Sequence, residues 1–337
     1  MEQRVLGKTG RPVSIVGLGT WQLGADWGSV TESDALAVLR AAVESGVTFL
    51  DTADVYGDGR SEQIIGRFLA DNAGHGVMVA TKMGRRVAQV PENYTLANFR
   101  AWTDRSRANL GVDRLDLVQL HCPPTPVYYS DATYDALDTL VAEERIAAYG
   151  VSVETCEEAL AAIARPGVAS VQIIFNAFRR KPLDQVLPAA SAAGVGIIVR
   201  VPLASGLLSG RYTMNTVFAP DDHRSYNRHG EAFDVGETFS GVDYAAGVRA
   251  AAEFAAITAE PGAFAAQADT AVTTAQAALR WVTQQPGVTT VIPGARNPGQ
   301  AEQNAAVAAL PLLSQHALGQ IEDLYDKYFR AEIHSRW

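Results

Sequence analysis

Short apolar runs alternate with helical patterns along most of the chain. Eight runs rich in β-branched or other apolar residues are candidate strands, and they cover residues 14–18, 47–50, 77–81, 115–120, 147–151, 171–175, 195–199 and 289–292. A polar or glycine-containing turn and a helical pattern follow each run. Because parallel strands are joined by crossover helices, this order predicts a parallel sheet. The runs are apolar throughout, which predicts strands buried on both faces.

The first helical segment shows clear end signals, and two later segments break the rhythm. Ser33 and Asp34 precede ALAVLRAAVESG and are the expected N-cap, while Gly46 lies just past the end. Residues 211–241 have no clean period, and a loop of this length usually carries function or is mobile. The tail after Arg330 is expected to fray.

Length and composition favour one large domain. Residues 1–337 contain no Ser/Pro-rich linker, and a (β/α)₈ TIM barrel with a long loop after its seventh strand accounts for the whole chain. With 28 basic and 37 acidic residues the net charge is −9, which opposes binding to nucleic acid or to an anionic membrane. Two cysteines and no signal-peptide or membrane-spanning pattern favour the reducing cytoplasm.

Polar residues stand where the predicted strands end. They are Asp51 with Tyr56, Lys82, His121, Ser152 and Asn176. In a barrel the loops after the strands converge at one face, so these side chains should lie together. Each alone could be structural, as a buried ion pair, a capping phenol or a satisfied core histidine. Several in consecutive loops favour a catalytic site.

The residue types fit one chemistry. A phenol with a pKa near ~10 is a poor acid at neutral pH, and an adjacent ammonium such as that of Lys82 would lower the pKa of Tyr56. Asp51 would keep Lys82 charged, and His121 would donate a hydrogen bond to a carbonyl oxygen that takes its proton from Tyr56. This combination predicts carbonyl reduction.

Four segments carry a resemblance to a known family. They read FLDTADVYGDGRSE, VATKMG, VQLHCPP and VIPGARNPGQAEQN, in this order along the chain. With them the chain resembles the aldo-keto reductases over nearly its whole length. The resemblance implies a (β/α)₈ barrel closed at the bottom by an N-terminal β-hairpin, here RVLGKTGRPVSIVG. It also implies NAD(P)H across the top of the barrel and a small aldehyde or ketone as substrate.

The resemblance assigns roles to single residues. Asp51, Tyr56, Lys82 and His121 match the catalytic tetrad, and Trp21, Tyr56 and His121 would contact the substrate. The residues matched to cofactor contacts are Gly19, Thr20, Trp21, Asp51, Ser152, Gln172, Arg200, Leu203, Ser205, Gly206, Arg211, Gly294, Arg296, Gln300 and Asn304. Arg296 could pair with a 2′-phosphate, which favours NADPH over NADH. It could instead cap a helix or pair with Glu302.

Two positions depart from the family pattern. Val153 stands where many members have an asparagine that binds the nicotinamide carboxamide, so that contact should rest on Ser152 and Gln172. Arg200 replaces an aromatic residue that stacks on nicotinamide. A guanidinium can also stack there, and its positive charge would favour the reduced, neutral cofactor and hence reduction.

Three other functions can be compared with the sequence. A Rossmann dehydrogenase needs G-x-G-x-x-G, and Gln22 takes the third glycine position. A metal-dependent hydrolase needs clustered ligands, but the histidines are scattered, and His223 and His229 are expected in solvent. A cofactor-sensing module or channel-subunit-like protein with little turnover is the alternative function.

Substrates would meet an aromatic pocket to which Trp27, Phe218 and Tyr226 contribute.

Overall fold

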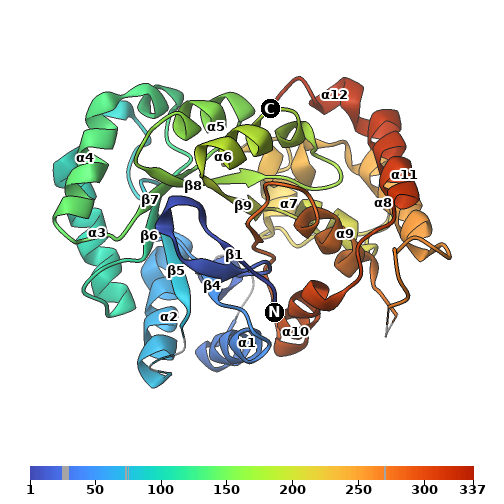
Figure 1. Ribbon diagram of the computed structural model, residues 1–337, viewed down its shortest axis with the longest axis horizontal. Coiled ribbons are helices and arrows are strands. Elements are labelled where there is room, and N and C mark those ends of the chain that lie inside the picture. Colours follow the sequence, from blue (N-terminus) through green and yellow to red (C-terminus); the bar gives the residue numbers. More distant parts are fainter. Residues whose placement is uncertain (25–29, 73, 75, 269–270) are drawn as a thin grey trace.

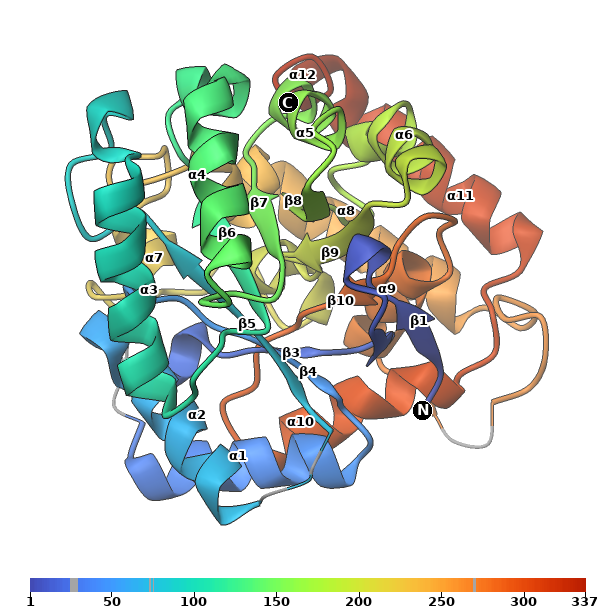
Figure 2. The ribbon, with the colours of Figure 1, turned by 60° about the vertical axis from the view of Figure 1, so that its left-hand side comes forward.

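Eight parallel strands form a barrel that the helices surround (Figures 1 and 2). The computed structural model describes residues 1–24, 30–72, 74, 76–268 and 271–337. The barrel strands are β3 (Leu18–Gly19), β4 (Phe49–Asp51), β5 (Met78–Met83), β6 (Leu117–His121), β7 (Tyr149–Ser152), β8 (Val168–Ile174), β9 (Gly196–Arg200) and β10 (Thr290–Val291). Neighbours pair in this order, and parallel bridges from Val16 to Val291 and from Gly19 to Gly294 close the ring. The predicted barrel is confirmed.

An antiparallel hairpin closes the bottom of the barrel, as the resemblance implied. It consists of β1 (Gln3–Val5) and β2 (Pro12–Ser14). At its tip Gly7 lies so close to the start of β9 that a Cβ would sit 2.2 Å from the backbone nitrogen of Gly196. The hairpin covers a small apolar cluster inside the barrel, made of Leu6, Val13, Phe49, Met78, Ala80, Leu117, Ile198 and Ile292. We call this cluster the floor.

The helices lie outside the barrel. They are α1 (Glu32–Glu44), α2 (Arg60–Asp71), α3 (Leu96–Leu110), α4 (Asp131–Ala142), α5 (Cys156–Ile163), α6 (Val186–Ala193), α7 (His223–Tyr226), α8 (Tyr244–Ala259), α9 (Thr274–Thr283), α10 (Pro298–Ala305), α11 (Gln315–Tyr325) and α12 (Ala331–Ile333). The predicted cap of α1 was wrong by two residues, because Thr31 accepts the bond from the backbone nitrogen of Asp34. Gly46 follows the helix with φ +93°, as expected. No described helix has the length and apolar character needed to cross a bilayer.

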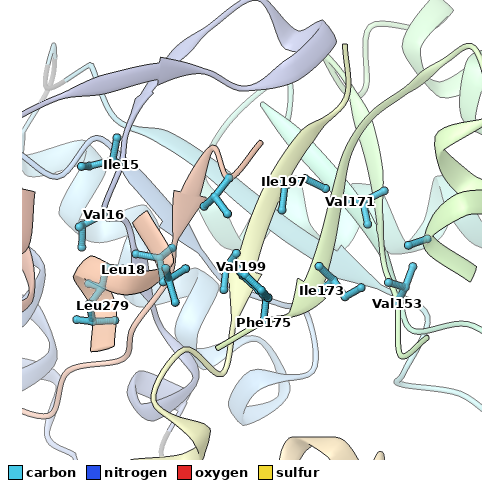
Figure 3. Packing of buried hydrophobic residues seen from close by; sticks show 14 of the residues in the cluster. Ile15, Val16, Leu18, Val153, Val171, Ile173, Phe175, Ile197, Val199 and Leu279 are labelled. Atoms are coloured by element: carbon cyan, nitrogen blue, oxygen red, sulfur yellow. The ribbon is translucent and has the colours of Figure 1, made fainter. Parts of the chain in front are cut away.

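Side chains alternate between the two faces of the strands. Figure 3 shows Ile197 and Val199 of β9 in the outer core, which also contains Leu279 of α9. Ile198, between them in sequence, belongs to the floor. Towards the top of the barrel the inward positions become polar, as at Arg200. The prediction of uniformly apolar strands was therefore wrong for the upper half of the barrel.

This alternation also explains why the strand boundaries were misplaced. His121, Ser152 and Arg200 are the last residues of their strands, and Lys82 lies inside β5. The sequence placed all of these just after the apolar runs, because a polar residue appeared to end each strand. Inward polar side chains are compatible with a continuing strand when they have partners inside the barrel.

The long loop and the tail are both packed against the barrel. Residues 211–241 contain α7 and short turns, and Asp234 and Glu237 from this loop pair with Arg200. The expected fraying of the tail was wrong. Trp337 is 8% exposed, and the guanidinium of Arg179 lies 3.9 Å from its ring centre.

Candidate active site

A buried ion pair lies at the top of the barrel interior. Asp51 ends β4 and Lys82 lies on the neighbouring β5, both pointing inward. Lys82 Nζ donates to Asp51 Oδ1 and to the backbone oxygen of Thr52, the latter at 2.9 Å. The exposed fractions of the lysine and aspartate side chains are 1% and 3%. A buried charge pair needs such added partners to offset its desolvation.

Tyr56 reaches this pair from a turn with unusual backbone angles. Gly57, Asp58 and Gly59 have φ values of +58°, +50° and +96°. A side chain at position 57 would place its Cβ 2.2 Å from the carbonyl oxygen of Gly24, so the turn requires glycine there. Arg105 donates to the carbonyl oxygen of Asp58 at 2.6 Å and holds the strained turn. The Tyr56 hydroxyl consequently lies 3.5 Å from Lys82 Nζ.

The protonation states suit a proton donor. Burial raises the pKa of Tyr56 above its usual 10, while the charge of Lys82 lowers it. The net effect is that the pKa of Tyr56 is raised. The expectation that Lys82 lowers this pKa is correct for the effect of Lys82 alone. Burial lowers the pKa of Lys82, but Asp51 and Tyr56 more than offset this and the pKa is raised. At neutral pH the site therefore holds a protonated phenol beside an ammonium.

His121 completes the group. Its ring meets that of Tyr56 edge-on, with centroids 6.0 Å apart and an interplanar angle of 85°. Burial, followed by the positive charges of Arg85, Lys82 and Arg200, holds the pKa of His121 well below 6.5. The imidazole is therefore neutral at pH 7 and carries one N–H to donate. The structure thus brings together all four residues of the predicted tetrad.

Two buried amides extend the network. Gln172 Nε2 donates to Asp51 Oδ2 at 2.8 Å and to Gln119 Oε1 at 3.3 Å. Gln119 Nε2 donates to the same Asp51 oxygen at 3.1 Å. Gln119 was missed by sequence reasoning. The signal was its position two residues before His121 in β6, which places both side chains on the inner face.

A cavity of about 410 Å³ runs from this group to the start of α10. Most of the predicted cofactor residues line it, namely Gly19, Thr20, Trp21, Asp51, Gln172, Arg200, Leu203, Ser205, Gly206, Arg211, Gly294, Arg296 and Gln300. Ser152 and Asn304 do not. The Ser152 hydroxyl is buried and accepts a bond from Cys122 Sγ at 3.4 Å. Asn304 donates to the carbonyl oxygen of Gly294 at 3.2 Å and thereby shapes the cavity wall.

Arg200 lines the cavity but is not an isolated cation. It pairs with Glu237 and, at 3.4 Å, with Asp234, and its Nη2 donates to the carbonyl oxygen of Val153 at 3.1 Å. Two carboxylates neutralise the positive charge from which we inferred a preference for reduction. That inference loses its basis. The carboxylates come from the long loop, more than thirty residues away in sequence.

Aromatic rings cover the Tyr56 side of the cavity. Trp21 stacks on Tyr56 with centroids 6.2 Å apart, and it also contacts the rings of His223 at 5.1 Å and Phe233 at 6.0 Å. His223 was expected in solvent but is 5% exposed, whereas His229 is exposed as expected.

Two of the predicted aromatic pocket residues lie elsewhere, and a third is not described. Phe218 packs on Tyr212, with centroids 5.1 Å apart, and Tyr226 contacts Phe233, with centroids 6.2 Å apart. Neither Phe218 nor Tyr226 lines the cavity. Trp27 lies outside the described residues. The predicted residue Asn176 is buried, bonds to Ser240 and the carbonyl oxygen of Val201, and is structural.

The far end of the cavity lies at the start of α10, where Arg296 and Gln300 line it. Asn297 caps α10, and Gln300 accepts from the backbone nitrogen of Arg296 at 2.8 Å. The start of a helix together with an arginine favours an anionic group. Within the described ranges no group of three or more His, Cys, Asp and Glu side chains is arranged to hold a metal ion.

Comparisons with known proteins agree with this geometry. The model of the Aldo/keto reductase family matches residues 15–326. Aldo-keto reductase YhdN of Bacillus subtilis is 28% identical over 319 residues, which cover 94% of this chain and 91% of that protein. The structure of the glycerol dehydrogenase AKR11B4 from Gluconobacter oxydans superposes with a TM-score of 0.76 at 28% identity, covering 97% and 95% of the two chains. An aldo/keto reductase from Klebsiella pneumoniae in complex with NADP and acetate gives 0.68 at 25% identity, covering 96% of each chain.

Proposed function

The chain belongs to the aldo/keto reductase family and is a nicotinamide-dependent oxidoreductase, and we propose that it reduces an aldehyde or ketone with NADPH, with Tyr56 as the proton donor. The observation that carries the proposal is the Asp51–Lys82–Tyr56 contact series beside a neutral His121. Asp51 and Tyr56 line one end of a cavity whose other end favours an anion, whereas Lys82 and His121 contact Tyr56 from outside that lining.

Each residue has one task in this proposal. A nicotinamide bound in the cavity would supply the hydride. Tyr56 donates its hydroxyl proton to the carbonyl oxygen, so that the carbonyl becomes an alcohol. The ammonium of Lys82 stabilises the phenolate left on Tyr56, and Asp51 keeps that ammonium charged. The neutral imidazole of His121 donates a hydrogen bond that holds the carbonyl oxygen near Tyr56.

The cavity lining fits a long, anionic cofactor. Gly206 has φ +99°, and a Cβ there would lie 2.6 Å from the hydroxyl of Tyr212, so the loop wall requires glycine. Gln172 and Arg200 would hold the nicotinamide end, and Arg296 with the start of α10 would hold the adenosine end. An arginine there favours the 2′-phosphate of NADPH.

A spectrophotometric assay tests the proposal. NADPH and NADH oxidation would be followed with a panel of aldehydes, ketones and sugars. We expect consumption of NADPH that depends on added carbonyl compound. Tight NADPH binding without turnover on any member of the panel would instead support a cofactor-sensing or channel-subunit-like role.

The choice of cofactor has its own test. Arg296→Ala should weaken NADPH binding by about 1.5–3 kcal/mol, the contribution of a charge-assisted hydrogen bond, and leave NADH binding nearly unchanged. Fluorescence quenching of wild type and variant by both cofactors measures this. Equal losses for the two cofactors would show that Arg296 does not contact the 2′-phosphate. Arg249→Ala, on α8 and outside the cavity lining, is the control.

A further inference from the structure

Asp51 is shared by the proton-transfer residues and by the cavity. Its Oδ1 accepts from Lys82, and its Oδ2 accepts from Gln119 at 3.1 Å and from Gln172 at 2.8 Å. Gln119 and Gln172 are 0% and 1% exposed. Because an ionised carboxylate only accepts hydrogen bonds, both amides must direct Nε2 towards it. The orientation of both glutamines is therefore determined by Asp51.

The strand register makes this arrangement possible. Gln119 on β6 is opposite Lys82 on β5 and opposite Gly150 on β7. Gln172 lies on β8, one strand further, and still contacts Gln119 at 3.3 Å. A Cβ at position 150 would lie 2.2 Å from Ser170 Oγ, so glycine is required between the two glutamines. A larger residue there would occupy the inner face that the amides cross.

Counting donors fixes what Gln172 can still do. A glutamine amide has two N–H groups, and those of Gln172 are directed to Asp51 and Gln119. Its Oε1 remains as an acceptor, and Gln172 lines the cavity whereas Gln119 does not. The amide group of a ligand would therefore have to donate to Gln172 rather than accept from it.

We propose that Gln119 is a positioning residue that acts in two directions. Gln119 accepts a hydrogen bond from Gln172 and thereby holds the Gln172 side chain with its Oε1 towards the cofactor cavity. Gln119 also donates a hydrogen bond to Asp51 and thereby delocalises the negative charge of that carboxylate, which influences Tyr56. Gln119 thus couples cofactor affinity to the proton-transfer residues. The inference rests on the proposed function, and the experiments below separate the two.

The first experiment measures cofactor affinity. Gln119→Met keeps the length of the side chain but removes both bonds, and the NADPH dissociation constant from fluorescence quenching should rise about three- to tenfold. Gln284→Met is the matched control, because Gln284 accepts from the backbone nitrogen of Leu313 at 2.8 Å and neither residue lines the cavity. That control should bind NADPH as the wild type does.

A double-mutant cycle tests whether Gln119 acts through Gln172. Gln172→Met alone should weaken NADPH binding. In that background Gln119→Met should add little further loss, because the side chain it positions is already gone. Losses that simply add would overturn the proposal.

A second variant separates the two directions and remains informative if Gln119→Met does not fold. Gln119→Glu keeps an acceptor for Gln172 but places a second carboxyl against Asp51, and two carboxyls this close share a proton. At mildly acidic pH we expect NADPH affinity within twofold of wild type. The kcat/KM of Gln119→Glu should fall several-fold as the pH rises. This fall should occur at a lower pH than the fall in the wild type.

The outcomes are distinct. A wild-type protein that neither binds nor oxidises NADPH contradicts the proposed function. In the other case the wild type binds and oxidises NADPH, while Gln119→Met has the same NADPH affinity or Gln119→Glu has the same pH profile of kcat/KM. Either result contradicts only the role of Gln119.

Discussion

The two ends of the barrel interior are built on the same strands but from opposite chemistry. On β6, Leu117 points into the floor, and Gln119, two residues later, contacts Asp51. The floor is apolar throughout and sealed by Leu6 and Val13 of the hairpin. The top instead buries Asp51 and Lys82 with their amide partners. Apolar burial stabilises the fold directly, whereas buried charges are costly unless each has partners. We therefore infer that the floor serves folding and the top serves function.

Lys82→Met should reduce both the stability of the fold and the activity, and we expect the largest effect from it. It leaves the buried carboxylate of Asp51 without its counter-charge, which costs about 3–5 kcal/mol in free energy of unfolding. It also removes the ammonium that stabilises the Tyr56 phenolate, so reduction should be nearly lost. Urea melts and NADPH oxidation measure the two losses. A variant with wild-type stability would mean that the pair contributes nothing to folding.

Tyr56→Phe should reduce activity and leave the stability of the fold unchanged. Only a hydroxyl is removed, and the ring still stacks on Trp21. We expect kcat to fall by about 10² or more, with the melting temperature and NADPH affinity unchanged. Tyr129→Phe, at a half-exposed ring that does not line the cavity, is the matched control. Activity within a few-fold of wild type would contradict the role of Tyr56.

Leu6→Ala should do the reverse and affect folding alone. Leu6 is fully buried in the floor, and its truncation leaves a cavity that costs about 2–5 kcal/mol. The free energy of unfolding from urea melts should fall by this amount. At temperatures where the variant stays folded, kcat/KM should remain close to wild type. A large loss of kcat/KM in the folded variant would show that the floor and the top are mechanically coupled.

The smallest expected effect is a flat region in a pH profile. The pKa of His121 is held well below 6.5 by burial and by Arg85, so its protonated form should be absent at neutral pH. The profile of kcat/KM should therefore lack a histidine limb between about pH 6 and 8. An inflection near pH 6.5 that disappears in His121→Gln would contradict this assignment.

Sequence reasoning predicted the fold, and it predicted that the four candidate catalytic residues lie together, because both follow a regular rule. Asp51, Lys82 and His121 recur at one end of successive strands, and the barrel brings those ends together. The role of Gln119 was not predicted because its strand was interpreted as uniformly apolar. The partners of Arg200 could not be predicted, because Asp234 and Glu237 come from a loop without periodicity. The burial of Trp337 depends in the same way on distant contacts with Arg179 and Gly241.

The bridges that close the ring determine when the barrel can close during synthesis of the chain. Val16 and Val291 are 275 positions apart, so the ribosome must release nearly the whole sequence before this joint can form. Until then the nascent barrel is an open sheet with two exposed margins. The cavity spans this joint, with Thr20 on one margin and Gly294 on the other. A ligand held by both margins would therefore act as a clasp, and hydrogen exchange at the Gly17, Gly19 and Val291 amides, which bond across the joint, should slow most when it binds.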